Sequence, residues 1–133
     1  MASRYLVPSS YSGPDTLTTS STYISGISGV SGVVHDNNGN LYIAATNSHC
    51  IVKYEISTGT QTVIAGLSGT SGNADGTGSA ARFNEPFDIL IDSSSGNLFV
   101  TDRFNYKIRK ITPAGVVTTW LTLSTAIIGF AID

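Results

Sequence analysis

The sequence predicts an all-β fold built from four-stranded antiparallel sheets that pack side by side like the blades of a propeller. Three observations support this prediction. The chain has 133 residues with 14 glycines and only 12% charged residues, and its polarity comes from Ser and Thr, which favour strands and turns. No segment keeps a helical period over ten residues. The segment Val33–Ala65 recurs as Ile89–Leu121, and each copy contains four short strands separated by turn residues.

The two copies share landmarks along their whole length. These are Asp36 and Asp92, Gly39–Tyr42 and Gly96–Phe99, Ile51–Lys53 and Ile108–Lys110, and Gly59 and Gly115. A third copy begins at Phe130–Asp133. A closed propeller has four to eight blades, and at roughly 40 to 55 residues per blade this chain supplies at most three. We therefore expect one chain to form an incomplete ring.

The elements follow in order along the chain. We expect the long Gly66–Pro86 connection to be a loop without a strand, since its first thirteen positions are rich in glycine and hold no large residue after Leu67. Phe83 is expected to anchor a single helical turn over Ser79–Phe83. Outer strands are expected at Tyr5–Val7 and Leu17–Ile24. The predicted organisation is residues 1–31 as an N-terminal segment supplying outer strands for ring closure, 32–66 as the first blade, 67–87 as a Gly-rich loop, 88–121 as the second blade, and 122–133 as the first strand of a third repeat.

Several of these pieces together resemble an NHL-repeat β-propeller over roughly Gly32–Asp133. The matching pieces are VVHD and ILID before the turns, the GNLY and GNLF units, NYKIRKI at Asn105–Ile111, GVVTTW at Gly115–Trp120 and ADGTGSAARFNEP at Ala74–Pro86. The chain departs from the pattern at Ala45, where the second copy has Asp102, and at Cys50, where it has Lys107. The resemblance implies a propeller scaffold. It also raises two alternatives, because some related propellers are metal-dependent lyases or hydrolases and some bind RNA.

Charge and cysteine content exclude several classes. A net charge of −2 gives no positive field to gather nucleic acid, and no apolar run is long enough to span a membrane. The single cysteine, Cys50, cannot form an internal disulfide. No secretory leader or membrane segment is expected, and the low-charge composition is compatible with an extracellular or viral particle, so the sequence leaves the localisation open.

A basic and aromatic stretch is the first candidate site. Four of the seven positive charges lie in it, with aromatic residues between them: Arg103, Phe104, Tyr106, Lys107, Arg109 and Lys110. Single-stranded RNA is bound by stacking and phosphate contacts of this kind. Lys107 and Arg109 alternate with Ile108, however, as on a solvated strand face, and we expect such a face rather than an RNA site.

Loops at one end of the blades form the second candidate, a surface for a partner. It comprises Asn47, His49, Asp75, Arg82 and Asp102, of which Asn47 and Asp102, with Asn105, are also expected to form turns. No metal or cofactor is expected, because His35 and His49 are the only histidines and a catalytic zinc needs three protein ligands. The pattern G-x-G-x-x-A at Gly76–Ala81 lacks the βαβ setting of a dinucleotide site.

The large aromatic residues are expected to pack between blades rather than to form a ligand cage: Tyr42, Phe83, Phe99 and Trp120. The sequence thus favours a non-enzymatic interaction or scaffold module. Its ring would be completed by head-to-tail self-association as a dimer or trimer, by another protein, or by the rest of a longer chain.

Overall fold

The computed structural model describes residues 3–6, 23–127 and 129, which form strands and three single-turn 3-10 helices. The strands are β1 (Ser3–Leu6), β2 (Tyr23–Ile27), β3 (Val30–His35), β4 (Asn40–Ala45), β5 (Cys50–Glu55), β6 (Thr60–Gly66), β7 (Gly76–Thr77), β8 (Pro86–Ile91), β9 (Leu98–Asp102), β10 (Lys107–Ile111) and β11 (Val116–Thr122). The 3-10 helices are η1 (Thr46–Ser48), η2 (Gly78–Ala80) and η3 (Arg103–Asn105). The predicted all-β class is confirmed. No helix in this part of the chain is long and apolar enough to cross a membrane.

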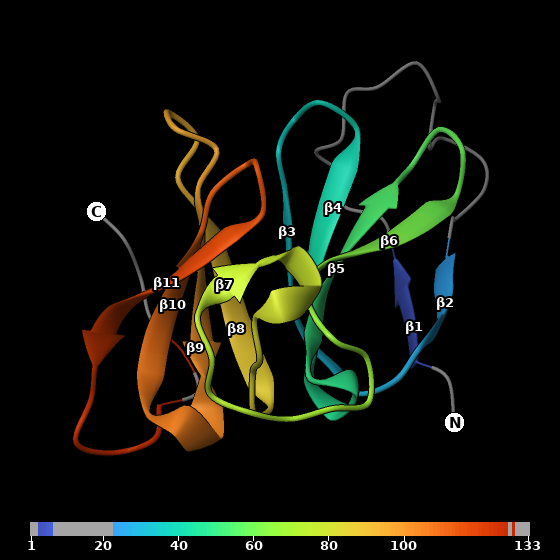
Figure 1. Ribbon diagram of the computed structural model, residues 1–133. Coiled ribbons are helices and arrows are strands. Elements are labelled where there is room, and N and C mark those ends of the chain that lie inside the picture. The colour runs from blue at the N-terminus through green and yellow to red at the C-terminus, as the bar shows by residue number, and fades with distance from the viewer. Residues whose placement is uncertain (1–2, 7–22, 128, 130–133) are drawn as a thin grey trace.

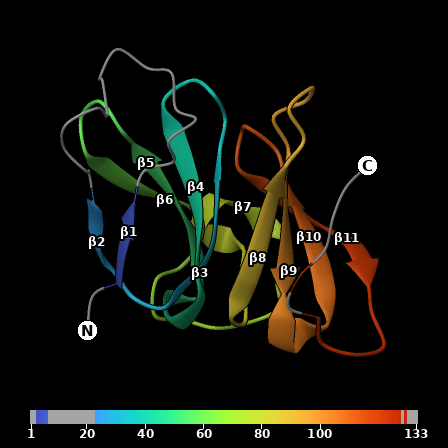
Figure 2. The ribbon, with the colours of Figure 1, turned by 180° about the vertical axis from the view of Figure 1, so that it is seen from behind.

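Three antiparallel sheets stand in a row that does not close (Figure 1). The first blade has the order β3-β4-β5-β6, and the second has β8-β9-β10-β11 with β7 added beyond β11. The β1–β2 pair lies on the side of the first blade away from the second, as the view from behind also shows (Figure 2). Each blade is a meander, so consecutive connections alternate between the two ends of the sheet. We call the end with η1 and η3 the helix end, and the opposite end the hairpin end.

The strand β7 corrects one prediction from the sequence. Gly76 and Thr77 pair antiparallel with Val117 and Val116 of β11, so the Gly-rich connection does contribute a short strand. The outer edge of β11 otherwise carries unpaired N–H and C=O groups, and any extended backbone can pair with them whatever its side chains. The single helical turn is η2, and Phe83 beyond it is fully buried, as expected for its anchor.

The core consists of two layers, one on each side of the first blade. Between β1–β2 and the first blade, the apolar layer includes Ile24, Leu41, Ile43 and Val52. The second layer lies between the two blades. It consists of Ala44, Ile51, Ala65, Ala81, Phe83, Ile89, Leu98, Val100, Ile111 and Val117. Both faces of the first blade are therefore buried. Successive side chains of a strand point to opposite faces of the sheet, so apolar residues at successive positions place apolar side chains on both faces.

The innermost strands of the two blades, β3 and β8, lie close together at Gly32. A Cβ atom at this glycine would lie 2.9 Å from the Phe87 carbonyl oxygen and 3.1 Å from the Asp88 Cα atom. Contacts this short with backbone atoms leave no room for a side chain. Gly32 thus sets the spacing of the blades.

The N-terminal segment forms two strands that overlap the predicted ranges only in part, and its role in ring closure stays a prediction. Tyr5 and Leu6 lie in β1, and Tyr23 and Ile24 lie in β2. The remainder of the predicted second outer strand, in residues 17–22, lies outside the described residues. The same holds for the start of the third repeat at Phe130–Asp133, so that part of the predicted organisation stays a prediction.

Candidate functional site

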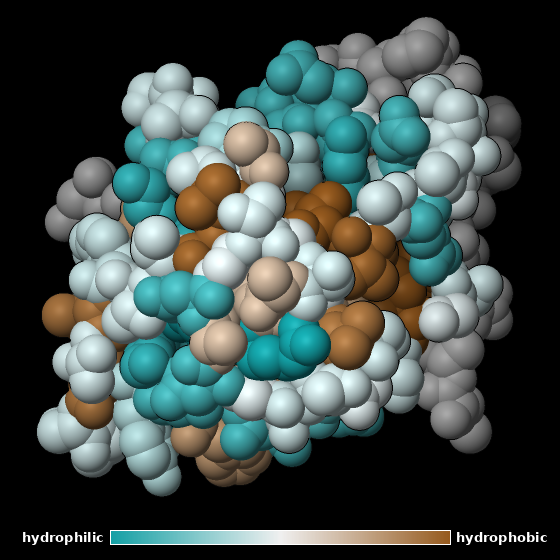
Figure 3. All heavy atoms as spheres, in the orientation of Figure 1, coloured by the Kyte–Doolittle hydropathy of each residue, from teal (hydrophilic) through white to brown (hydrophobic). Residues whose placement is uncertain are grey.

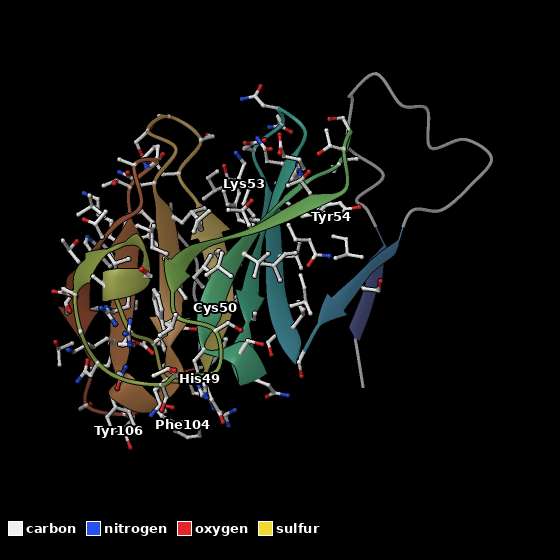
Figure 4. All side chains as sticks on the ribbon, turned by 45° about the vertical axis from the view of Figure 1, so that its right-hand side comes forward. His49, Cys50, Lys53, Tyr54, Phe104 and Tyr106 are labelled. Atoms are coloured by element: carbon white, nitrogen blue, oxygen red, sulfur yellow. The ribbon has the colours of Figure 1, made fainter. Side chains whose placement is uncertain are left out.

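The helix end is built from the same turn in both blades. After η1 the chain passes through His49 (φ 58°), and after η3 it passes through Tyr106 (φ 55°), both in the left-handed region. This region is uncommon for residues with a side chain, and here it reverses the chain between the second and third strands of each blade. Figure 4 shows His49, Phe104 and Tyr106 together at this end. Phe104 is 45% and Tyr106 46% exposed.

Arg103 holds the exposed part of η3 in place. Its guanidinium carbon lies 4.9 Å from the centre of the Phe104 ring and 5.3 Å from that of Phe87, and one nitrogen lies 3.8 Å from a Glu85 carboxylate oxygen. Such cation–π contacts at partly exposed positions contribute roughly 0.5–1 kcal/mol each. The result is a small, ordered surface of one cation between aromatic rings.

Beneath this surface lies a buried arginine. The Arg109 side chain is fully buried, and its Nη1 atom donates to the Asp102 carboxylate at 2.7 Å and to the Arg82 carbonyl oxygen at 2.9 Å. Its Nη2 atom donates to the Ala74 carbonyl oxygen at 2.7 Å and to the Asp75 carboxylate at 2.8 Å. The guanidinium also lies over the Phe83 ring, at 5.1 Å from the centre. Arg109 thereby fastens the long loop to the second blade.

The two carboxylates beside Arg109 differ in environment. Burial raises the pKa of Asp102 above its ordinary value, although hydrogen bonds from Asn105, the Asn84 N–H group and Arg109 oppose this shift. Burial acts in the same direction on Asp75 but is outweighed by hydrogen bonds from Thr119 and Arg109, so its pKa lies below the ordinary value. A fully buried arginine held by two carboxylates is a structural clamp, because no solvent or ligand can reach its guanidinium.

These positions correct the predicted basic surface. Arg109 and Asp102 are fully buried, so neither belongs to an exposed site. Lys107 and Arg109 lie on the face of β10 that meets the long loop, which buries Arg109 but leaves Lys107 half-buried, with its ammonium donating to Asn73 at 2.7 Å. Lys110 alternates with them and lies on the other face of the second blade. Of the predicted six, Phe104 and Tyr106 are exposed beside Arg103, and the half-buried Lys107 is engaged by the loop.

Most of the predicted loop surface is also at the helix end, but much of it holds the loop together. The His49 Nδ1 atom accepts a hydrogen bond from the Glu85 N–H group at 3.1 Å, and Asn105 donates to the Gly72 carbonyl oxygen at 2.7 Å. The predicted loop residues Asn47 and Asp75 are exposed, and Arg82 is half-buried. Within residues 3–6, 23–127 and 129, no three His, Cys, Asp or Glu side chains form a group that could hold a metal ion.

The outer face of the second blade is a candidate site that was not predicted from the sequence. Trp120 packs edge-on against Phe99, with ring centres 5.1 Å apart, yet remains 54% exposed. Leu121 beside it is 45% exposed. The predicted packing between blades thus holds for Phe83 and Tyr42 but not, in this chain, for Phe99 and Trp120. The repeat contained a sign of this interface position. Trp120 and Leu121 align with Ile64 and Ala65, which pack between the blades.

The fold is therefore that of an open, partial β-propeller, and comparisons with solved structures agree. An auxiliary nutrient binding protein from Bacteroides thetaiotaomicron is similar at 26% identity and a TM-score of 0.60, over 79% of this chain and 29% of that one. A protein of the same description from Bacteroides ovatus is similar at 26% identity and a TM-score of 0.57, over 69% of this chain and 25% of that one. These neighbours are propeller-type folds.

Virginiamycin B lyase from Staphylococcus aureus is similar in fold alone, with 19% identity and a TM-score of 0.54 over 75% of this chain and 29% of that one. This chain thus spans less than a third of the length of each of these neighbours. No protein-family model matches the sequence, and no curated protein does.

Proposed function

We propose that the chain is a segment of an NHL-type propeller that acts as a non-enzymatic interaction scaffold, and that the outer face of its second blade binds a further blade. We define this joining face by Phe99, Trp120 and Leu121. The observation that supports the proposal is the contrast between equivalent residues of the two blades. Ala65 is fully buried against the second blade, whereas its counterpart Leu121 is exposed. Exposed tryptophan and leucine side by side are typical of an interface.

The β1–β2 pair suggests where the further blade comes from. It is a sheet of two strands, with β1 paired only to β2 among the described residues, and it covers the first blade as another blade would. A four-stranded blade would need two more strands beside β1. A head-to-tail contact can supply one of them, because the C-terminal segment of one copy would pair with β1 of the next. In a solution of this chain alone, the partner is a second copy; in a longer protein, further repeats would take its place.

The neighbours described as nutrient binding proteins support a role in binding. The exposed surface at the helix end, with Arg103 between Phe104 and Phe87, is then the place for a protein partner of the completed ring. Stoichiometric calcium or zinc in the purified protein would instead favour the metal-dependent enzyme.

Self-association is tested by light scattering over a hundredfold range of concentration. We expect a dimer or trimer for the wild-type chain and a shift to monomer for Trp120→Asp, because a carboxylate at the centre of the interface would be buried without a partner. Leu67→Asp is the matched control. It places the same charge on another exposed apolar residue, away from the joining face, and should leave the mass unchanged. A wild-type monomer at every concentration, or equal effects of both substitutions, would contradict self-association through this face.

A further inference from the structure

A cleft of about 460 Å³ opens between the two blades at the hairpin end. The first blade contributes Tyr42, Lys53 and the turn between β3 and β4, and the second contributes the turns between β8 and β9 and between β10 and β11. Figure 4 shows Lys53 at the opposite end of the molecule from Phe104 and Tyr106, so this cleft is separate from the surface at the helix end. Its volume is in the range of small-molecule sites, which is about 300–1,000 Å³.

The floor of the cleft is apolar. Ile64 of the first blade and Ile91, Leu98 and Pro113 of the second line it, and the first three continue the layer between the blades. Figure 3 shows hydrophobic side chains where the blades meet, with hydrophilic side chains above them at the first blade's hairpin. Apolar ligand surface placed on such a floor is removed from water, which favours binding.

The one carboxylate in the lining, Asp36, is already fully engaged by its own turn. One of its oxygens accepts hydrogen bonds from the N–H groups of Asn38 at 2.8 Å and Asn40 at 3.2 Å. The other accepts one from the Asn40 amide at 2.7 Å and a longer one from the Tyr42 hydroxyl at 3.4 Å. These bonds outweigh the effect of burial and hold the pKa of Asp36 below its ordinary value. Its lone pairs are thus not available to the hydroxyl groups of a ligand.

The polar groups that remain include one cation, Lys53. Among the residues that the structure describes, the Lys53 ammonium has no hydrogen-bond or ion-pair partner, and it borders the cleft. The side chains of Asn37, Asn38 and Ser93 also line the cleft without a side-chain hydrogen bond within this part of the chain. An ammonium group offers three donors and no acceptor. The cleft therefore combines an apolar floor with an uncommitted cation at its edge.

We propose that this cleft binds a small carboxylic acid with a compact apolar body. The body lies on the floor formed by Ile64, Ile91 and Leu98, and the carboxylate accepts charge-assisted hydrogen bonds from Lys53 and further ones from the Asn37 and Asn38 amides. A sugar fits less well, because it would place hydroxyl groups on the apolar floor and find Asp36 occupied. Both walls belong to one chain, so the site does not depend on how the ring is completed.

A titration of the ¹⁵N-labelled chain with 3-phenylpropionate, followed by NMR, tests the proposal. We expect saturable shifts confined to backbone amides around the cleft, such as those of Asn38, Gly96 and Gly115. The amide of the same acid, 3-phenylpropionamide, should bind at least fivefold more weakly, because it lacks the charge. Glucose should cause no saturable shift at these amides.

Lys53→Met should weaken binding of the acid at least fivefold and abolish its preference over the amide. Lys107→Met removes the same charge at the helix end, outside the cleft, and should leave the acid's affinity unchanged. The dispersed amide spectrum of each variant shows that it is folded. The proposal is overturned if 3-phenylpropionate causes no saturable shift at these amides, if acid and amide bind equally, if glucose binds there instead, or if Lys53→Met keeps the wild-type affinity.

Discussion

Replacing Arg109 with methionine tests whether the long loop depends on the buried guanidinium. The substitution keeps an unbranched, apolar stem but removes four hydrogen bonds at 2.7–2.9 Å, to Arg82, Asp102, Ala74 and Asp75. It also leaves the fully buried Asp102 without its cation. Removing one partner of a buried ion pair costs about 3–5 kcal/mol. The total stability of a domain is about 5–15 kcal/mol, so the variant should fold but be much less stable.

Urea unfolding measures this loss. For a denaturant slope of roughly 2 kcal/mol/M, a destabilisation of about 4 kcal/mol lowers the midpoint by about 2 M. The loss should be smaller at pH 5 than at pH 7.5. Without Arg109, the already raised pKa of Asp102 in the folded variant rises further above its value in the unfolded chain. As the pH falls, Asp102 therefore takes up a proton in the folded variant before it does so in the unfolded chain, and the free energy of unfolding increases.

Two further variants define the outcome. Arg103→Met breaks a half-exposed pair at 3.8 Å and removes two cation–π contacts, and it should cost about 1–2 kcal/mol, less than Arg109→Met. The double change Asp102→Ala with Arg109→Val gives the second blade the residues that the first has at Ala45 and Val52, and it should cost less than Arg109→Met alone, because no buried charge is left unpaired. If Arg109→Met costs no more than Arg103→Met, the clamp does not hold the loop and the reasoning fails.

Two more predictions concern the blade junction and the cysteine. Gly32→Ala should destabilise the chain by about 1–3 kcal/mol in the same urea assay, because its methyl group would lie 2.9 Å from the Phe87 carbonyl oxygen. An unfolding midpoint equal to that of the wild type would contradict this, since it would show that the inner strands can separate without cost. Cys50 is buried, and burial raises the pKa of its thiol to about 11. It should therefore stay unmodified by iodoacetamide at pH 8 for as long as the chain is folded and react once urea unfolds it; rapid labelling of the native protein would contradict this burial.

Much of the second blade could be predicted from local signals. The turn at residues 92–97 follows from a run of serines before Gly96-Asn97, and Asp92 organises it by accepting bonds from Ser94 and Ser95. Its first-blade counterpart, Asp36, does the same with Asn38 and Asn40. Because these contacts are between residues at most four positions apart, the sequence contains both partners of each.

Arg109 shows why the candidate site was predicted less well. Charge and alternation with Ile108 suggested a solvated face, since an arginine is rarely buried. Its partners Ala74 and Asp75 are 35 and 34 positions away, and Arg82 is 27 positions away. One local signal did favour burial. The aligned residue of the first blade is the apolar Val52, which places position 109 on the inward face of its strand.

The sequence by itself determined the repeating four-strand unit, its turns and the shortage of blades, because these depend on alternation, glycine positions and length. Only the tertiary structure decided which face of the second blade is covered, that the loop adds β7 and closes over Arg109, and that Lys53 borders a cleft between the blades. Those features depend on which surfaces meet when the sheets pack, and contacts between distant segments leave little trace in local sequence pattern.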